Sequence, residues 1–159
     1  MSEAIESSVA VEAQPNAVWR ALTDPSQMAR WMAEPEVQVE IDTTWKVGTP
    51  ILVRGFHHLP FENRGTVLLF EPHSVLRYSH LSSLSRLPDR PENYSMIEFR
   101  LFPTEETGST LLTIRLSDFP TVPIMKHLDF YWRATLHVLK RVIESHKEPL
   151  LGDRRPTTQ

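Results

Sequence analysis

Residues 122–147 read VPIMKHLDFYWRATLHVLKRVIESHK and predict one long amphipathic helix. The side chains of its mainly apolar stripe recur every three or four residues, at Leu128, Tyr131, Trp132, Thr135, Val138, Leu139 and Val142. Polar side chains follow the opposite face at the same spacing, and Pro123 falls in the first turn, where its missing N–H costs least. At 1.5 Å per residue the helix is roughly 39 Å long, so it must lie across most of a sheet.

The chain before this helix predicts short antiparallel strands separated by turn residues. Strands are expected over Ile5–Val11, Val37–Ile41, Pro50–Phe56, Gly65–Glu71, Val75–His80, Ser95–Phe102 and Thr110–Leu116. Two short helices are expected after the first strand, over Pro15–Leu22 and Asp24–Met32. An antiparallel sheet with one apolar face needs a cover, and the C-terminal helix is large enough to provide it. The predicted fold class is α+β, with a curved sheet of about six or seven strands wrapped around that helix.

Length and composition predict one domain over residues 1–159, with an ordered core at about 4–147 and a tail at 148–159. The formal charge of −3 argues against nucleic-acid binding, which usually needs clustered positive charge. The chain has no cysteine, no signal-peptide pattern and no stretch of about 20 apolar residues. We therefore expect a cytoplasmic protein that is not an integral membrane protein.

The order of elements, with AQPNAVWRALTDPSQMARWM near the start and FYWRATLHVLKRVIE near the end, resembles the START/Bet v 1-like (SRPBCC) superfamily. GTVLLFEPHSVLRYSH and SMIEFRLFPTEETGSTLLTIRLSDF resemble strand pairs of its Hsp90-ATPase-activator-homologue (AHSA1-like) branch. The resemblance covers about residues 4–146 and implies a helix-grip fold with a deep hydrophobic cavity. It does not imply one reaction, because the superfamily includes lipid carriers, aromatase/cyclases and hormone receptors.

Two segments depart from the family pattern. Trp45–Pro50 stands where the branch often has a Gly-Gly pair, which predicts a different turn into the third strand. Leu81–Asn93 is long for a hairpin loop and could fold over a cavity mouth.

The cavity implied by the resemblance places apolar and aromatic side chains of sheet and helix against a ligand. Its predicted lining is Trp31, Phe56, Leu76, Tyr78, His80, Ile97, Phe99, Leu112, Ile114, Phe119, Leu128, Trp132, Leu136 and Leu139. In VLRYSH, Leu76, Tyr78 and His80 alternate and should share a face. If that face is concave, Tyr78 and His80 are candidates to orient a polar group or to transfer protons. The alternative is a core histidine bonded to a neighbouring backbone or hydroxyl group.

Other chemistry has little support in the sequence. His57 and His58 are adjacent, so on a strand they point to opposite faces and cannot chelate one ion, and we expect neither metal nor cofactor. Glu98 and Arg100 alternate with apolar residues and predict a solvated outer face.

Three functions remain open at this point. The first is binding of a hydrophobic or aromatic small molecule, lipid-like or polyketide-like, in the internal cavity. The second is a cyclase/aromatase-type enzyme that uses Tyr78 or His80. The third, implied by the branch name, is contact with a chaperone such as Hsp90. For the oligomeric state we expect a monomer or a homodimer.

Overall fold

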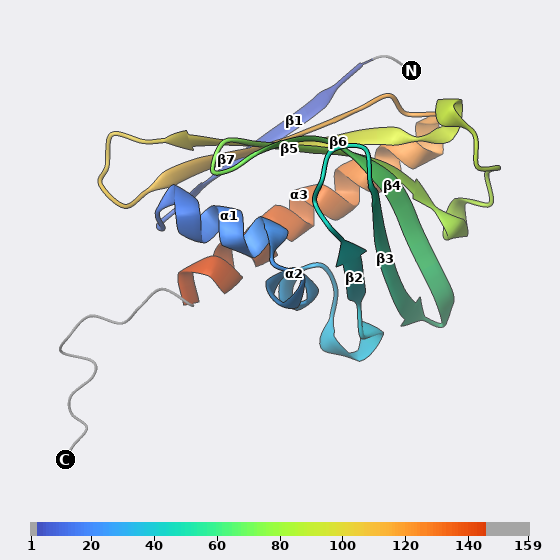
Figure 1. The fold of residues 1–159 in the computed structure, drawn as a ribbon, viewed down its shortest axis with the longest axis horizontal. Helices are drawn as coiled ribbons and strands as arrows, with labels where there is room; N and C mark the ends of the chain where they lie inside the picture. Colours follow the sequence, from blue (N-terminus) through green and yellow to red (C-terminus); the bar gives the residue numbers. More distant parts are fainter. Residues whose placement is uncertain (1–2, 146–159) are drawn as a thin grey trace.

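A computed structural model describes residues 3–145, in which seven antiparallel strands form one sheet in the order β1-β7-β6-β5-β4-β3-β2 (Figure 1). The strands are β1 (Ile5–Val11), β2 (Glu40–Thr43), β3 (Pro50–His57), β4 (Leu59–Glu71), β5 (Val75–Ser82), β6 (Ser95–Pro103) and β7 (Thr110–Ser117). The helices are α1 (Pro15–Thr23), α2 (Pro25–Trp31) and α3 (Val122–Ser145). The predicted tail at 148–159 lies outside the described residues.

The two short helices begin where their capping residues predict. Pro15 opens α1, where no hydrogen bond from its nitrogen is needed. Asp24 caps α2, because its carboxylate Oδ1 accepts from the backbone N–H of Ser26 at 3.0 Å. Trp31, at the end of α2, donates its indole N–H to the Ala21 carbonyl at 2.9 Å and so ties the two helices together.

The long helix α3 runs across one face of the sheet, with α1 and α2 on the same side (Figure 1). Alternate residues of β6 and β7 point toward it, so Ile97, Phe99, Leu112 and Ile114 are each about 1% exposed or less. Because both layers present an apolar face, burying them against each other stabilises the sheet and the helix together. The helix-grip α+β fold is therefore confirmed.

Two strands start more than two residues from their predicted positions. Pro35–Val37 forms a 3₁₀ turn, and Gln38 has a left-handed backbone with φ of 54°, so extended structure starts only at Glu40. β4 begins at Leu59, six residues before the predicted start at Gly65. The extra length lacked an alternating apolar pattern, and its backbone pairing with β3 defines it as a strand instead.

The longer β4 also changes the environment of the adjacent histidines. His57 pairs with Leu59 across the β3–β4 hairpin, and His58 between them adopts a φ of 67° to make the turn. The prediction that His57 and His58 point to opposite faces is therefore wrong, since their ring centroids lie 4.7 Å apart. In residues 3–145, no group of three or more His, Cys, Asp or Glu side chains is arranged to hold a metal ion.

Candidate functional site

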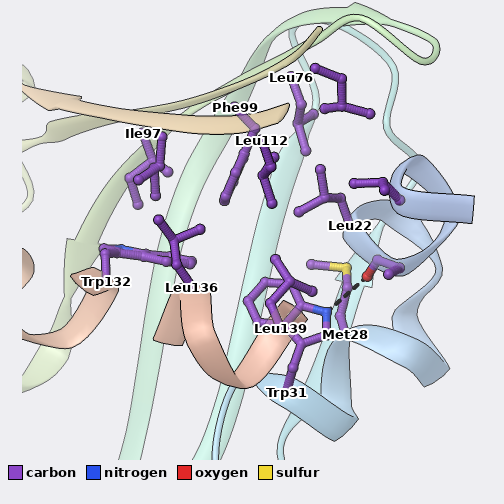
Figure 2. Close-up of a cluster of buried hydrophobic side chains, with 14 of the residues drawn as sticks. Leu22, Met28, Trp31, Leu76, Ile97, Phe99, Leu112, Trp132, Leu136 and Leu139 are labelled. Carbon is purple, nitrogen blue, oxygen red and sulfur yellow. Dashed lines mark hydrogen bonds between the residues drawn. The ribbon is translucent and has the colours of Figure 1, made fainter. Parts of the chain in front are cut away.

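The residues predicted to line the cavity form the centre of the molecule. All of them except Phe56 and His80 belong to one cluster of buried side chains between sheet and helices (Figure 2). Trp132 of α3 connects the sheet with α2, with its ring centroid 5.5 Å from that of Phe99 and 6.0 Å from that of Trp31. These contacts give the residues a packing role, and their contact with a ligand stays a prediction.

Phe56 does not join this cluster. It lies near the end of β3, is 56% exposed, and pairs with Pro60 across the β3–β4 hairpin. The hairpin tip exposes Leu59 to a similar degree, at 50%. Phe56 therefore does not line an interior space, because the hairpin carries it beyond the covered part of the sheet.

A pocket of about 230 Å³ lies at the end of β5, beside the first turns of α3. Residues 83–94, which we call the cover loop, complete its wall and lie near the start of α3 (Figure 1). The residues around it are His80, Leu81, Ser82, Leu84, Ser85, Leu87, Asn93, Ser95, Ile124, His127 and Leu128. Of the predicted site residues, the structure thus brings His80 and Leu128 to this pocket.

His80 and Ser95 are direct partners across β5 and β6. Both line the pocket, and in the described part of the chain no hydrogen bond engages the His80 imidazole or the Ser95 hydroxyl. Burial, with a smaller contribution from nearby His127, lowers the pKa of His80 to about 4. The imidazole is therefore neutral at neutral pH, and it offers the pocket one donor and one acceptor.

The other polar side chains that β5 and the cover loop bring to this part of the pocket already have partners. Ser82 Oγ accepts from Leu84 N at 3.2 Å, and Ser85 Oγ donates to Ser82 O at 2.7 Å. Asn93 Nδ2 donates to Pro88 O at 2.9 Å. These bonds hold the loop in its own conformation, whereas the His80 imidazole and the Ser95 hydroxyl have no hydrogen-bond partner among the described residues.

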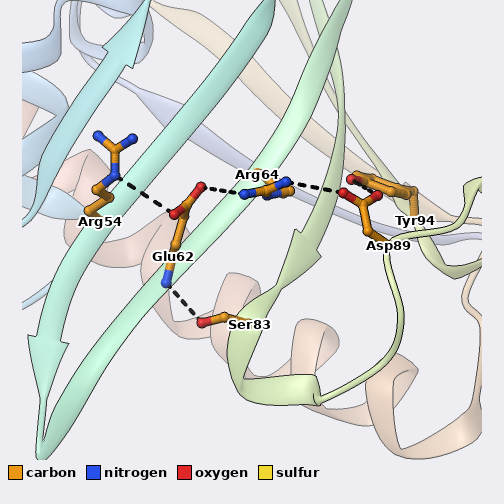
Figure 3. Close-up of polar contacts among 6 residues, drawn as sticks. All are labelled: Arg54, Glu62, Arg64, Ser83, Asp89 and Tyr94. Carbon is orange, nitrogen blue, oxygen red and sulfur yellow. Dashed lines mark hydrogen bonds and ion pairs between the residues drawn. The ribbon is translucent and has the colours of Figure 1, made fainter.

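Polar contacts on the outside of the cover loop attach it to β4 (Figure 3). Ser83 Oγ accepts from the backbone N–H of Glu62 at 2.9 Å, and Arg64 contacts Asp89 at 3.1 Å. Asp89 also accepts from the Tyr94 hydroxyl at 2.6 Å, and this bond is the largest cause that lowers the Asp89 pKa. Sequence reasoning noted the unusual length of this loop but could not place its residues against α3.

Tyr78 lies one alternation before His80 on β5 and is 4% exposed. Its ring packs against those of Phe99 and Trp45, with centroids 6.4 Å and 6.3 Å away. Burial raises the pKa of its hydroxyl, and no described residue hydrogen-bonds that hydroxyl. Trp45 was not predicted as a core contact; it reaches inward because its backbone has a φ of 61° and its indole N–H donates to Thr23 O at 2.6 Å.

Close contact between β4 and β5 fixes the position of the β5 backbone next to His80. A Cβ atom on Gly65 would lie 1.7 Å from the backbone oxygen of Ser79, so no larger residue fits there without moving a strand. Ser79 Oγ in turn accepts from the backbone N–H of Thr66 at 2.9 Å. The position of His80 therefore depends on a glycine on the neighbouring strand.

The outer face of the sheet is less solvated than predicted. Glu98 is 6% exposed because Arg77 and Arg100 cover it, at 2.7 Å and 2.5 Å from its carboxylate oxygens. Burial alone would raise the Glu98 pKa, but the hydrogen bonds from Arg100 and Arg77 outweigh it and lower the pKa. The alternation put Glu98 on the correct face, but it could not show that two arginines exclude water from its carboxylate.

Comparison with solved structures supports this fold. Protein ChR145 of Cytophaga hutchinsonii is 27% identical, with a TM-score of 0.73 over 91% of this chain and 96% of that one. CalU16 of Micromonospora echinospora is 23% identical, with a TM-score of 0.68 over 89% and 76% of the two chains. The Aha1 dimer of Colwellia psychrerythraea is 21% identical, with a TM-score of 0.70 over 92% and 99%.

Comparison by sequence gives a family. None of the curated proteins matches the chain. Within residues 3–145, none of the helices has the length and apolar character needed to cross a membrane. The family described as "Activator of Hsp90 ATPase homolog 1-like protein" matches residues 12–144, which is most of the chain. The chain therefore belongs to the family of proteins like the activator of Hsp90 ATPase homologue 1.

Proposed function

We propose that this protein binds a small hydrophobic molecule in the pocket between β5, the cover loop and α3. The observation that carries the proposal is the pocket itself, whose wall contains four leucines and one isoleucine together with the unengaged polar groups of His80 and Ser95. Such a combination is typical of small-molecule sites, where apolar contacts supply affinity and a few polar groups orient the ligand. Domains of this fold typically bind hydrophobic ligands.

The pocket volume limits the size of the ligand. An apolar cavity of about 150 Å³ holds one benzene molecule, and drug-sized sites begin near roughly 300 Å³. At about 230 Å³, this pocket suits a single substituted ring or a short acyl chain. A larger lipid or polyketide would need the cover loop to move outward.

The test is a titration of the full chain with ethylbenzene, followed by amide chemical shifts and thermal stability. We expect saturable shifts at the residues around the pocket and a higher Tm, because a ligand that binds only the folded chain stabilises it. Ile124→Phe should fill the pocket from α3 and weaken binding, whereas Val122→Phe, two residues earlier and 41% exposed, should not. Equal binding by these two variants would show that the probe binds elsewhere.

A catalytic function is the second candidate, favoured by the arrangement of Tyr78 and His80. Both side chains project from the same face of β5, and in residues 3–145 neither is hydrogen-bonded. A neutral imidazole can accept a proton from a bound substrate, as general-base chemistry in a cyclase or aromatase requires. Loss of turnover in His80→Gln with ligand affinity retained would support this candidate, and full turnover in that variant would exclude His80 as the base.

A further inference from the structure

The charge of the pocket wall limits which molecules it can bind. None of the residues around the pocket is Lys, Arg, Asp or Glu. Of the charged residues of the cover loop, Asp89 pairs with Arg64 of β4 on the outside of the loop, and Arg86, Arg90 and Glu92 do not line the pocket. A ligand with a buried carboxylate or ammonium group would therefore lose its hydration without meeting an opposite charge, which is costly in a mainly apolar site.

The strand side of the pocket nevertheless favours one polar contact. The His80 imidazole and the Ser95 hydroxyl lie side by side on paired strands and lack protein partners among the described residues. Each can donate one hydrogen bond and accept another. A hydroxyl group matches this pair, because it also donates and accepts, whereas a carboxylate can only accept.

We propose that the ligand is an uncharged, hydroxyl-bearing molecule of about one ring, a phenol or an alcohol, whose hydroxyl is held by His80 beside Ser95. This inference rests on the proposed function, since it assigns the ligand class of the same pocket. The lowered pKa of His80 is consistent with it, because a neutral imidazole retains the acceptor nitrogen that a hydroxyl donor needs. His127, also at the pocket but exposed, is the titratable group that faces His80 from α3.

Three probes of one shape separate this inference from the proposed function: ethylbenzene, 4-ethylphenol and 4-ethylbenzoate. At about pH 7 the phenol is neutral, since phenolic groups ionise near 10, and the benzoate is charged. We expect 4-ethylphenol to bind about fivefold more tightly than ethylbenzene, through the added hydrogen bond, and at least about tenfold more tightly than 4-ethylbenzoate. The imidazole nitrogen shifts of His80 should change with the phenol and stay nearly constant with ethylbenzene.

Two variants assign the preference to His80. His80→Leu should remove the advantage of 4-ethylphenol over ethylbenzene, and His80→Gln, which keeps a donor and an acceptor, should retain part of it. Binding of 4-ethylbenzoate as tight as that of the phenol would overturn the ligand class while leaving the pocket a binding site. An unchanged phenol preference in folded His80→Leu would overturn the role of His80. Failure of all three probes to bind would overturn the proposed function and this inference with it.

Discussion

Arg64 of β4 contacts Asp89 of the cover loop, with 3.1 Å between Nη1 and Oδ2, and the same carboxylate accepts from Tyr94 (Figure 3). The pocket wall thus depends on contacts made on the solvent side of the loop. Such exposed ion pairs contribute little to global stability, but they can select the conformation of a short segment.

Asp89→Asn should loosen the cover loop without unfolding the protein. The substitution removes the ion pair with Arg64 and weakens the bond from Tyr94, so amides of residues 83–94 should exchange hydrogen several times faster. Amides of β6 and β7 should be unaffected. Glu6→Gln, which removes the exposed pair with Arg115, is the matched control and should leave exchange in the loop unchanged. Equal loop exchange in Asp89→Asn and the wild type would show that the loop's internal bonds suffice.

Glu98→Gln should lower the free energy of unfolding by about 1 kcal/mol at neutral pH, because charged hydrogen bonds from two half-exposed arginines are lost. The Glu98 pKa is lower in the folded chain, so the unfolded chain takes up the proton first. The stability that ionised Glu98 contributes is therefore fully present above its unfolded-state pKa near 4.3. It is lost as the pH falls through the lower pKa of Glu98 in the folded chain. Urea unfolding across this range should show the variant and the wild type converging in acid.

Asp129→Asn is the control for that experiment. Asp129 pairs with Arg133 one turn along α3 at 2.7 Å, and the arginine is 60% exposed. Such a pair contributes a few tenths of a kcal/mol at most. A loss in Asp129→Asn as large as that in Glu98→Gln would contradict the role assigned to burial.

The outcome at α3 shows what periodicity can and cannot predict. The helix began at Val122 as expected, and its apolar stripe faces the sheet, because the spacing of three and four residues fixes which side chains share a face. Three residues of this stripe, Leu128, Trp132 and Leu139, were also predicted to contact a ligand. Periodicity shows which face is buried, but it cannot separate packing from ligand contact, since both need the same apolar side chains.

The conformation of the cover loop, unlike that of α3, could not be predicted from periodicity. Its residues have no regular period, and their positions depend on pairs far apart in sequence, such as Glu62 with Ser83 and Arg64 with Asp89. The unusual length of Leu81–Asn93 was the available signal, and residues of this segment line the pocket. Ser95 gave no signal, because its role depends on its pairing with His80 across two strands.

Leu139→Ala tests the packing role of the central cluster. Leu139 is fully buried under the sheet, and removing its side chain should cost about 2–5 kcal/mol of unfolding free energy by leaving a cavity. The affinity for 4-ethylphenol should stay within about twofold of wild type, because Leu139 does not line the pocket beside the cover loop. A large loss of affinity with little change in stability would instead place the ligand in the central cluster.

His80 should make the stability of the protein depend on pH between about 4 and 6.5. Its folded pKa is about 4, below the value near 6.5 expected in the unfolded chain. Between these two pKa values, the unfolded chain binds a proton at His80 and the folded chain does not. The free energy of unfolding is therefore highest above about pH 6.5. It falls by roughly 2–3 kcal/mol as the pH decreases toward 4. Urea unfolding at several pH values should show a flatter profile for His80→Gln. His137→Gln, at an exposed position on α3, should keep the wild-type slope. If His80→Gln keeps the same slope, burial does not lower the pKa of His80 in the folded protein.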